Sequence, residues 1–203
     1  MTTLTLTNSD IDTHIIDATP DTNNATAIQA FFGERTAATS VNRFLIKFDL
    51  SALPADAVIS STTLSLYFDG DASSNARTLR VYRVKRVWVE AEATWNIYST
   101  GNSWSTAGGF HADDCEQTDI GSKDLTATET LNEFKAISLT PTTKADLDLG
   151  NGWLLKMDTE SDDAYRVRTS EHTTSANRPM LEIVYTQGGG PSTIIRSPMW
   201  GRF

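Results

Sequence analysis

Short runs in which apolar residues alternate with polar ones are the feature that most constrains how this chain folds. In Arg43–Leu50, for example, Phe44, Ile46 and Phe48 alternate with charged residues, although Leu45 breaks the pattern. A period of two predicts a strand with one buried face. Similar runs occur at Leu64–Phe68, Trp153–Met157, Tyr165–Val167 and Leu181–Tyr185, with weaker candidates at Leu4–Leu6, Ile11–Ile15 and Ile28–Phe32. We therefore expect about eight strands.

Helical periodicity, by contrast, is scarce. Thr126–Lys135 is one short candidate, and Lys144–Leu149, preceded by Thr140-Pro141, resembles a capped helical turn. The apolar residues of Thr78–Val89 change parity, which we interpret as one strand bent by a bulge. Gly108-Gly109, Asp69-Gly70 and Gly150-Asn151-Gly152 predict turns between strands. Many strands and few helices favour an all-β fold, namely an antiparallel, jelly-roll-like β-sandwich with one or two short helices.

The chain divides into three parts. Its 203 residues allow one domain of ordinary size, which we place at residues 1–186. The Gly-rich run 187–192 predicts a flexible linker. Residues 193–203 form a short apolar and basic tail that would be prone to aggregate if exposed. We therefore expect the tail to be an assembly arm, buried against a partner through Ile194, Ile195, Trp200 and Phe203. The alternative is a tail that folds back on its own domain.

Charge and cysteine content exclude several classes of protein. The formal net charge of -9 disfavours binding to nucleic acid or to anionic membrane surfaces. No apolar run is long enough to cross a membrane. The single cysteine, Cys115, cannot form an intrachain disulfide, and it excludes a zinc finger. Stability must therefore come from packing.

Several blocks of sequence are similar to a known family. Arg43–Pro54 (RFLIKFDLSALP), Ile59–Tyr67 (ISSTTLSLY), Leu79–Asn96 (LRVYRVKRVWVEAEATWN), Gly152–Lys156 (GWLLK) and Asn177–Tyr185 (NRPMLEIVY) follow one another in the order found in the DNRLRE domain. This domain is related to the disaggregatase repeats and to a family of carbohydrate-binding modules. The resemblance implies a jelly-roll-like sandwich without catalytic activity. Such modules are often attached to secreted or surface proteins and sometimes bind acidic polysaccharide.

Two pairs of residues are candidates for binding a glycan. Tyr98 and Trp104 belong to a loop rich in Gly, Ser and Thr, where an aromatic face could stack on a sugar ring. The alternative is a loop that simply folds over the end of the sandwich. Arg166 and Arg168 alternate with apolar residues, so their guanidinium groups share one face and could clamp a carboxylate such as a uronate. Ordinary cross-strand salt bridges are the alternative for these arginines.

The acidic residues suggest a metal site more readily than a catalytic one. Asp113, Asp114 and Asp119, together with His111 and Glu116, form a loop rich in hard oxygen ligands, which suit structural calcium. The alternative is a solvated acidic loop. Glu90 and Glu92 stand at strand spacing and could act as a pair, with solvated charge as the alternative. Trp88 and Trp95 are assigned to the core. No cofactor is expected, apart from this candidate calcium ion.

Three functions remain open. The first hypothesis is a noncatalytic structural or adhesion protein of a phage virion, either a capsid decoration or a tail-associated protein. Two features support this hypothesis: no export signal follows Met1, and the sequence contains a single module with no attached catalytic domain. Its partners would be other virion proteins, further copies of the chain and surface polysaccharide. The alternative is a secreted or cell-surface carbohydrate-binding module or adhesin. An enzyme is the third possibility, but none of the isolated histidines belongs to a catalytic motif.

Overall fold

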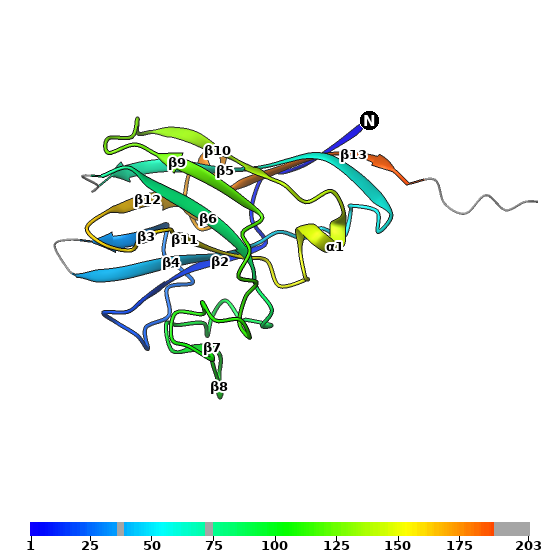
Figure 1. The fold of residues 1–203 in the computed structure, drawn as a ribbon. Coiled ribbons are helices and arrows are strands. Elements are labelled where there is room, and N and C mark those ends of the chain that lie inside the picture. Colours follow the sequence, from blue (N-terminus) through cyan, green and yellow to red (C-terminus); the bar gives the residue numbers. More distant parts are fainter. Residues whose placement is uncertain (36–38, 72–74, 189–203) are drawn as a thin grey trace, which may run out of the picture.

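The computed structural model describes residues 1–35, 39–71 and 75–188 (Figure 1). The predicted arm, with Ile194, Ile195, Trp200 and Phe203, lies outside these residues. The strands are β1 (Thr2–Leu6), β2 (Ile11–Ile16), β3 (Gln29–Arg35), β4 (Ser40–Lys47), β5 (Ala57–Asp71), β6 (Arg77–Arg83), β7 (Ile97–Ser99), β8 (Asn102–Ser103), β9 (Gly121–Leu125), β10 (Glu133–Leu139), β11 (Trp153–Met157), β12 (Ala164–Arg168) and β13 (Met180–Gln187). One short helix, α1 (Lys144–Leu147), and one 3-10 turn, Ser175–Asn177, complete the described elements.

The main sheet closes on itself. Antiparallel pairing runs in the order β5-β10-β9-β6-β11-β4-β3-β12, and β12 then pairs with β5, so that eight strands form a barrel-like arrangement. β2 pairs with β4 outside this circuit. β13 pairs with β5, and β1 pairs with β13, so that these two strands extend the sheet beyond the barrel (Figure 1). The all-β prediction is confirmed. The sheet is closed, however, and does not divide clearly into the two layers of a jelly-roll sandwich.

The length of β5 explains the closure. Its 15 residues pair with β10 along one edge, and with β13 and then β12 along the other. A register shift between Arg166 and Val167 marks the point where β12 meets β5. Such an irregularity bends a sheet and increases its twist. Asp69-Gly70, predicted as a turn, lies inside β5 for the same reason: the strand continues to Asp71 in order to pair with β12.

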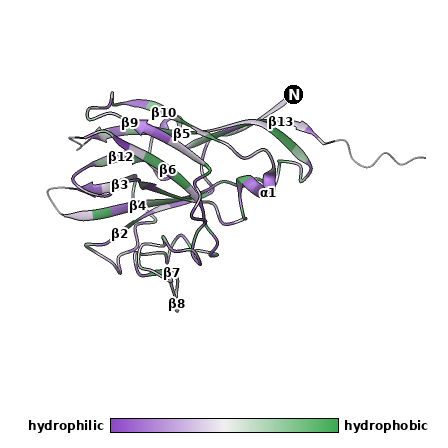
Figure 2. Ribbon diagram, viewed as in Figure 1, coloured by the Kyte–Doolittle hydropathy of each residue, from purple (hydrophilic) through white to green (hydrophobic). Residues whose placement is uncertain are grey.

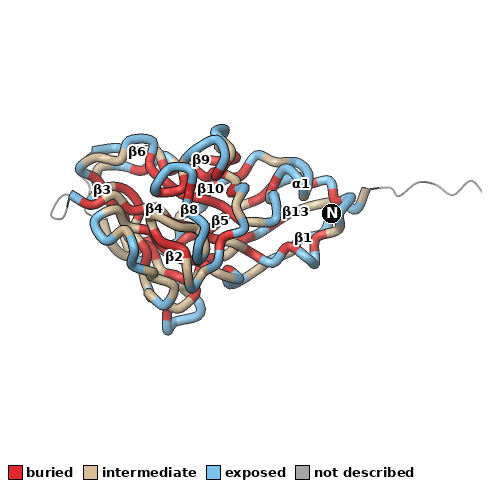
Figure 3. Tube along the Cα trace, turned by 90° about the horizontal axis from the view of Figure 1, so that it is seen from below, coloured by how far each residue is buried: buried red, intermediate tan, exposed pale blue. Residues whose placement is uncertain are grey.

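The main core contains the residues that the alternation predicts to be buried. It fills the barrel and extends to Leu181 and Ile183 of β13, which lies outside the circuit of eight strands. All nine residues expected there are at most 2% exposed. Figure 2 shows apolar and polar residues mixed along the barrel strands, and Figure 3 shows the buried strands beneath exposed connections. These core residues are Phe44, Ile46, Phe48, Leu64, Leu66, Trp153, Leu155, Leu181 and Ile183.

A second buried cluster lies outside the barrel. The segment 84–115, which we call the outer layer, covers the outer faces of β4, β6 and β11 and includes β7 and β8 (Figure 1). Leu45 of β4 and Leu154 of β11 belong to this cluster, so these strands are buried on both faces. This is why Leu45 breaks the alternation. The other buried members are Ile15, Tyr82, Val84, Trp88, Ala93, Trp104 and Cys115.

Burial on both faces also corrects the interpretation of Thr78–Val89. Leu79 and Val81 face the barrel interior, whereas Tyr82 and Val84 face the outer layer. β6 pairs with β11 in continuous register, so no bulge lies between these positions. The change of parity marks two cores, one on each side of the strand, and the chain leaves the sheet after Val84.

Of the two predicted helical segments, only one is helical. α1 occupies part of Lys144–Leu149, and it is capped by the Thr143 hydroxyl, which accepts a hydrogen bond from the Asp146 N–H, rather than by Thr140. The predicted helix Thr126–Lys135 is wrong, because Phe134 and its neighbours pair with β5 as part of β10. In the described part of the chain no helix is both long and apolar enough to cross a membrane.

Candidate functional site

The two aromatic residues proposed to stack on a sugar lie together, but one of them is buried. The ring centroids of Tyr98 and Trp104 are 5.3 Å apart. Trp104 is only 5% exposed, and its indole N–H donates to the carbonyl oxygen of Thr94 at 3.0 Å. Tyr98 is half-buried, with the Arg86 guanidinium 5.5 Å from its ring centroid. This arrangement matches the alternative reading of a loop folded over the sheet.

The Gly108-Gly109 turn lies against the rings of Trp104 and Trp95. Both glycines adopt positive φ, and a Cβ on Gly109 would approach the Trp104 ring to 3.2 Å. A Cβ on Gly108 would come within 2.7 Å of the Trp95 ring. Because glycine has no side chain, the turn can lie directly against both rings. The face of Trp104 is therefore not presented to a ligand. Trp88, assigned to the core, is 5% exposed, while Trp95 is only partly buried.

Arg166 and Arg168 share one face of β12, as predicted, and both contact Asp69 of β5. Their Nε atoms donate to the two carboxylate oxygens at 2.8 and 3.2 Å. Gln29 of β3 donates to the same carboxylate at 2.8 Å. Desolvation would raise the pKa of Asp69, but the hydrogen bonds from Arg166, Gln29 and Arg168 outweigh it and lower that pKa. The carboxylate is thus charged and fixes both guanidinium groups on the outside of the barrel.

Two hollows lie on the described surface, and the one beside Arg166 is lined by arginine and aromatic side chains. The other, of about 270 Å³, is larger and is described below. The hollow beside Arg166 has a volume of about 210 Å³, and it is lined by Phe31, Arg35, Gly70, Asp71, Ala164 and Arg166. In the sheet register Arg166 stands opposite Phe31 on one side and Gly70 on the other. A Cβ at Gly70 would lie only 3.0 Å from the Arg166 side chain. The missing side chain at Gly70 lets the arginine lie across the strand.

Aromatic rings accompany the arginines on this face. The Arg35 guanidinium lies 4.6 Å from the centroid of the Phe31 ring, and that of Arg168 lies 4.4 Å from the centroid of the Tyr67 ring. Tyr67 in turn packs edge-on against Phe134 of β10, with centroids 5.3 Å apart. Phe134 is 37% exposed. We call this surface, which crosses β3, β12, β5 and β10, the basic face; it comprises Phe31, Arg35, Tyr67, Asp69, Asp71, Phe134, Arg166 and Arg168.

The basic face carries local positive charge. Its three arginines exceed its two aspartates by one charge, whereas the whole chain has a net charge of -9. Arg35 is exposed. A cation on an aromatic face is attracted to the ring and remains able to bind an anion. The face can therefore attract and orient an anionic ligand that the rest of the surface repels.

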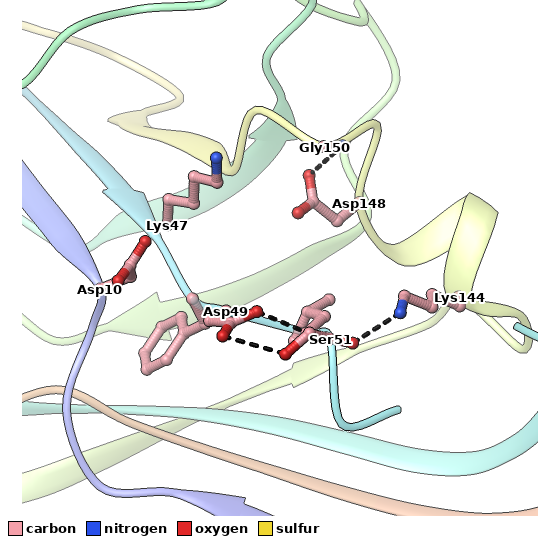
Figure 4. Close-up of a pocket in the computed structure, with 9 residues that line it drawn as sticks. Asp10, Lys47, Asp49, Ser51, Lys144, Asp148 and Gly150 are labelled. Carbon is pink, nitrogen blue, oxygen red and sulfur yellow. Dashed lines mark hydrogen bonds between the residues drawn. The ribbon is translucent and has the colours of Figure 1, made fainter. Parts of the chain in front are cut away.

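The larger hollow lies where β4 leads into the loop before β5 (Figure 4). Its polar groups hold the loops together: Lys144 Nζ donates to the carbonyl oxygens of Leu50 and Leu53 at 2.6 and 2.8 Å, and Asp49 accepts hydrogen bonds from Ser51. Three aspartates and two lysines line it, so it has no positive excess. The lining residues are Asp10, Lys47, Phe48, Asp49, Leu50, Ser51, Lys144, Asp148 and Gly150.

The acidic loop does not assemble the predicted calcium site. Asp114 is fully buried, where it accepts hydrogen bonds from the N–H groups of Ser105 and Thr106 and pairs with Arg86 at 3.0 Å. Asp119 pairs instead with Arg80 at 2.8 Å, and the Asp113 side chain is 69% exposed. Within the described ranges, no group of three or more His, Cys, Asp or Glu side chains is arranged to hold a metal ion.

Glu90 and Glu92, which could in principle have acted as a pair, have different hydrogen-bond partners. Glu90 and Glu92 lie in a turn rather than a strand. Glu90 accepts a hydrogen bond from the Asp12 N–H at 2.8 Å, and Glu92 accepts one from the Thr100 N–H at 2.7 Å. Each carboxylate thus accepts a hydrogen bond from a different segment.

Sequence reasoning missed much of the basic face. Arg166 and Arg168 were found from their alternation, but Phe31, Arg35 and Phe134 come from other strands. The signal that could have found Phe31 is its position between the buried residues Ala30 and Phe32, which directs it outward. Its proximity to Arg166 depends on the strand register, which the sequence does not specify.

Comparison with known families identifies the chain's relationship. Residues 3–185 match the family model of carbohydrate-binding module family 96. Because the match covers most of the 203 residues, the chain belongs to this family. No curated protein matches the chain significantly. The family match supports the wider resemblance to carbohydrate-binding modules, whereas the narrower DNRLRE assignment stays a prediction.

Proposed function

We propose that this member of carbohydrate-binding module family 96 binds acidic polysaccharide on its basic face without cleaving it. The family match supports a noncatalytic carbohydrate-binding role. The observation that carries the choice of ligand and site is the basic, aromatic-lined hollow on the outside of an otherwise acidic protein.

The arginines supply recognition of carboxylate groups. Asp69 accepts hydrogen bonds from the Nε atoms of Arg166 and Arg168, and its carbonyl oxygen also accepts one from Arg166 Nη2 at 3.0 Å. The remaining terminal N–H groups of the two guanidinium groups can bind a ligand. Arg35 is exposed at the other side of the hollow. A uronate bound between Arg35 and Arg166 would lie against the Phe31 ring. Charge-assisted hydrogen bonds of this type distinguish a carboxylate from a neutral hydroxymethyl group.

The aromatic residues supply apolar contact along a chain of sugars. Phe31, Tyr67 and Phe134 belong to three strands, so the rings are spread across the face rather than confined to one pocket. The C–H groups of a pyranose ring can pack on such side chains while its hydroxyl groups face the arginines. A surface of this kind suits an internal stretch of polymer more than a single monosaccharide.

The test compares acidic and neutral polysaccharides in affinity electrophoresis and calorimetry. We expect the wild-type protein to bind a polyuronate, more weakly as salt is added, and to bind a neutral glucan much less. Arg35→Gln and Phe31→Ala should each weaken polyuronate binding by about tenfold, which corresponds to about 1.4 kcal/mol.

Two controls define the outcome. Lys123→Gln removes a positive charge from β9, away from the basic face, and should leave binding unchanged. Tyr98→Ala tests the loop aromatic pair. If Tyr98→Ala abolishes binding while Arg35→Gln does not, the site lies on the outer layer. Release of new reducing ends by the wild-type protein, lost in Glu90→Gln, would contradict a noncatalytic role.

The narrower prediction is a phage virion component that uses such a module for adhesion. We keep it as a proposal for where the binding activity operates, with a secreted or cell-surface adhesin as the alternative. Mass spectrometry of purified virus particles tests it. A protein present in stoichiometric amounts supports a virion location, and a protein found only in the secreted or cell-wall fraction contradicts it.

A further inference from the structure

Three acidic residues from distant segments meet beside the start of β2. Asp12 belongs to β2, Glu90 to the turn after Trp88, and Glu171 to the loop after β12. The Asp12 N–H donates to Glu90 Oε1 at 2.8 Å, and the Ser170 N–H donates to Asp12 Oδ2 at 2.9 Å. The charge of Glu171 acts on both Asp12 and Glu90. Glu171 therefore repels both Asp12 and Glu90 at a point where three segments converge.

Two oxygen atoms of this cluster are buried without a partner. The Asp12 side chain is fully buried; its Oδ2 accepts hydrogen bonds from Ser9 and Ser170, but its Oδ1 has no hydrogen-bond partner among the described residues. Glu171 Oε1 accepts a hydrogen bond from the Ser170 hydroxyl, whereas its Oε2 is likewise buried and unpartnered. A buried carboxylate oxygen without a partner is strongly destabilising.

No cation of the described chain offsets these charges. No ion pair involves Asp12, Glu90 or Glu171 among the residues for which ion pairs are described. Burial, reinforced by the nearby Glu171, raises the pKa of Asp12 to about 7 despite its hydrogen bonds. His14, on the same strand, is no substitute, because burial lowers its pKa to about 4 and keeps the imidazole neutral. The arrangement thus has the charge and the oxygen atoms of a cation site.

We propose that a divalent cation, Ca²⁺, binds to Asp12 and Glu171 at their unpartnered oxygens, with Glu90 adding negative charge beside it. Calcium prefers hard oxygen ligands and commonly completes its shell with hydroxyl, carbonyl and water oxygens. Two carboxylates can therefore hold the ion when hydroxyl and water oxygens complete the shell. Hydroxyl oxygens are close, because Ser9 and Ser170 both contact Asp12 or Glu171.

A cation at this position would strengthen the connection between segments that hydrogen bonds already join. It would join β2, the turn of the outer layer that contains Glu90, and the loop that follows Arg168 of the basic face. The site shares no residue with the basic face, and the proposal does not depend on carbohydrate binding.

The experiment measures calcium binding by the whole chain after chelator treatment and dialysis. Calorimetry should give one site per chain. Calcium at about 100 times its Kd should raise the melting temperature by about 5 to 10 °C, because it binds the folded state alone. Magnesium, which holds its water more tightly, should have a much smaller effect. Terbium in place of calcium should give luminescence sensitised by the buried Trp88, two residues from Glu90.

Matched variants separate a cation site from a purely structural carboxylate. Asp12→Asn and Glu171→Gln should each abolish the calcium-dependent rise. In chelator, Asp12→Asn should melt no lower than the wild-type protein, because it removes repulsion. A structural carboxylate would instead give a lower melting temperature in both conditions. Asp113→Asn, in the exposed acidic loop, should keep the full calcium response.

The outcomes are decisive in either direction. If the wild-type protein shows no calcium heat and no calcium-dependent melting shift, the site does not exist. If Asp12→Asn and Glu171→Gln bind calcium as the wild-type protein does, the ion lies elsewhere. If Asp12→Asn fails to fold, Glu171→Gln and the wild-type terbium signal still decide the matter. Loss of calcium binding with polysaccharide binding intact would leave the proposed function standing.

Discussion

The barrel interior and the outer layer are both well buried, but different interactions hold them together. In the interior, aliphatic and aromatic side chains pack between strands whose backbones pair along continuous ladders. In the outer layer, short strands and turns depend on side-chain hydrogen bonds, such as those from the Trp88 indole to the Asn151 carbonyl and from the Ser105 N–H to Asp114. The comparison shows that burial alone does not reveal whether a region follows from a simple residue pattern.

The first prediction concerns the barrel interior and is the largest. Phe48→Ala should lower the free energy of unfolding by about 3 to 5 kcal/mol, because Phe48 is 2% exposed and its ring contacts Trp153. Denaturant unfolding followed by circular dichroism measures the change. Phe134→Ala is the control, since the same substitution at a ring that is 37% exposed should cost less than about 1.5 kcal/mol. Equal effects would mean that the two rings are equally buried.

The second prediction removes the carboxylate that holds the outer layer. Asp114→Ala should destabilise the protein by about 2 to 4 kcal/mol, because two backbone N–H groups and Arg86 lose their acceptor in a buried site. Denaturant unfolding measures it. Asp113→Ala changes the neighbouring, exposed carboxylate and should have almost no effect. A small effect of Asp114→Ala would mean that the apolar contacts hold the layer without it.

The third prediction concerns the turn that lies on the tryptophans. Gly108→Ala should cost about 1 to 3 kcal/mol, because its Cβ would lie 2.6 Å from the Arg43 guanidinium and 2.7 Å from the Trp95 ring. Gly101→Ala is the matched control: Gly101 also has positive φ, but a Cβ there meets nothing within 4 Å. The difference in melting temperature between the two variants isolates the steric contact from backbone strain. Equal melting temperatures would rule out that contact.

The buried residues of the interior could be predicted from the sequence because they recur at every second position along each strand. Residues such as Phe44 and Ile46 alternate with polar neighbours, and the backbone geometry of a strand directs them to one side. The closure of the sheet was not predictable in the same way. It depends on β12 pairing with both β3 and β5, and pairing between strands distant in sequence leaves no local pattern.

The outer layer resisted prediction for a related reason. Leu45, Tyr82 and Val84 face the outer layer. Strands that are buried on both faces carry apolar residues on both, so the alternation that would reveal which side faces the core is lost. The basic face was only half predictable: Arg166 and Arg168 share a face by strand geometry, but Phe31 joins them through register alone. The helix expected at Thr126–Lys135 was wrong because pairing with β5 overrides the weak helical pattern.

The last prediction asks whether the outer layer opens independently of the barrel, and Cys115 is the probe. It is the only cysteine of the chain, it is fully buried in the outer layer, and burial raises the pKa of its thiol to about 11. Because the thiolate is the reactive form, the native protein should react very slowly with thiol reagents near neutral pH. Labelling therefore reports how often the residue becomes exposed, and Cys115→Ser provides the blank.

The order of labelling rates among the variants distinguishes the two ways of exposing Cys115. If the outer layer opens by itself, Asp114→Ala should label fastest and Gly108→Ala next, by about tenfold for each 1.4 kcal/mol of local destabilisation, while Phe48→Ala labels much like the wild-type protein. If only global unfolding exposes the thiol, the rates must instead follow overall stability, and Phe48→Ala should label fastest. That second order would mean that the outer layer and the barrel unfold as one unit, despite the different interactions that hold them.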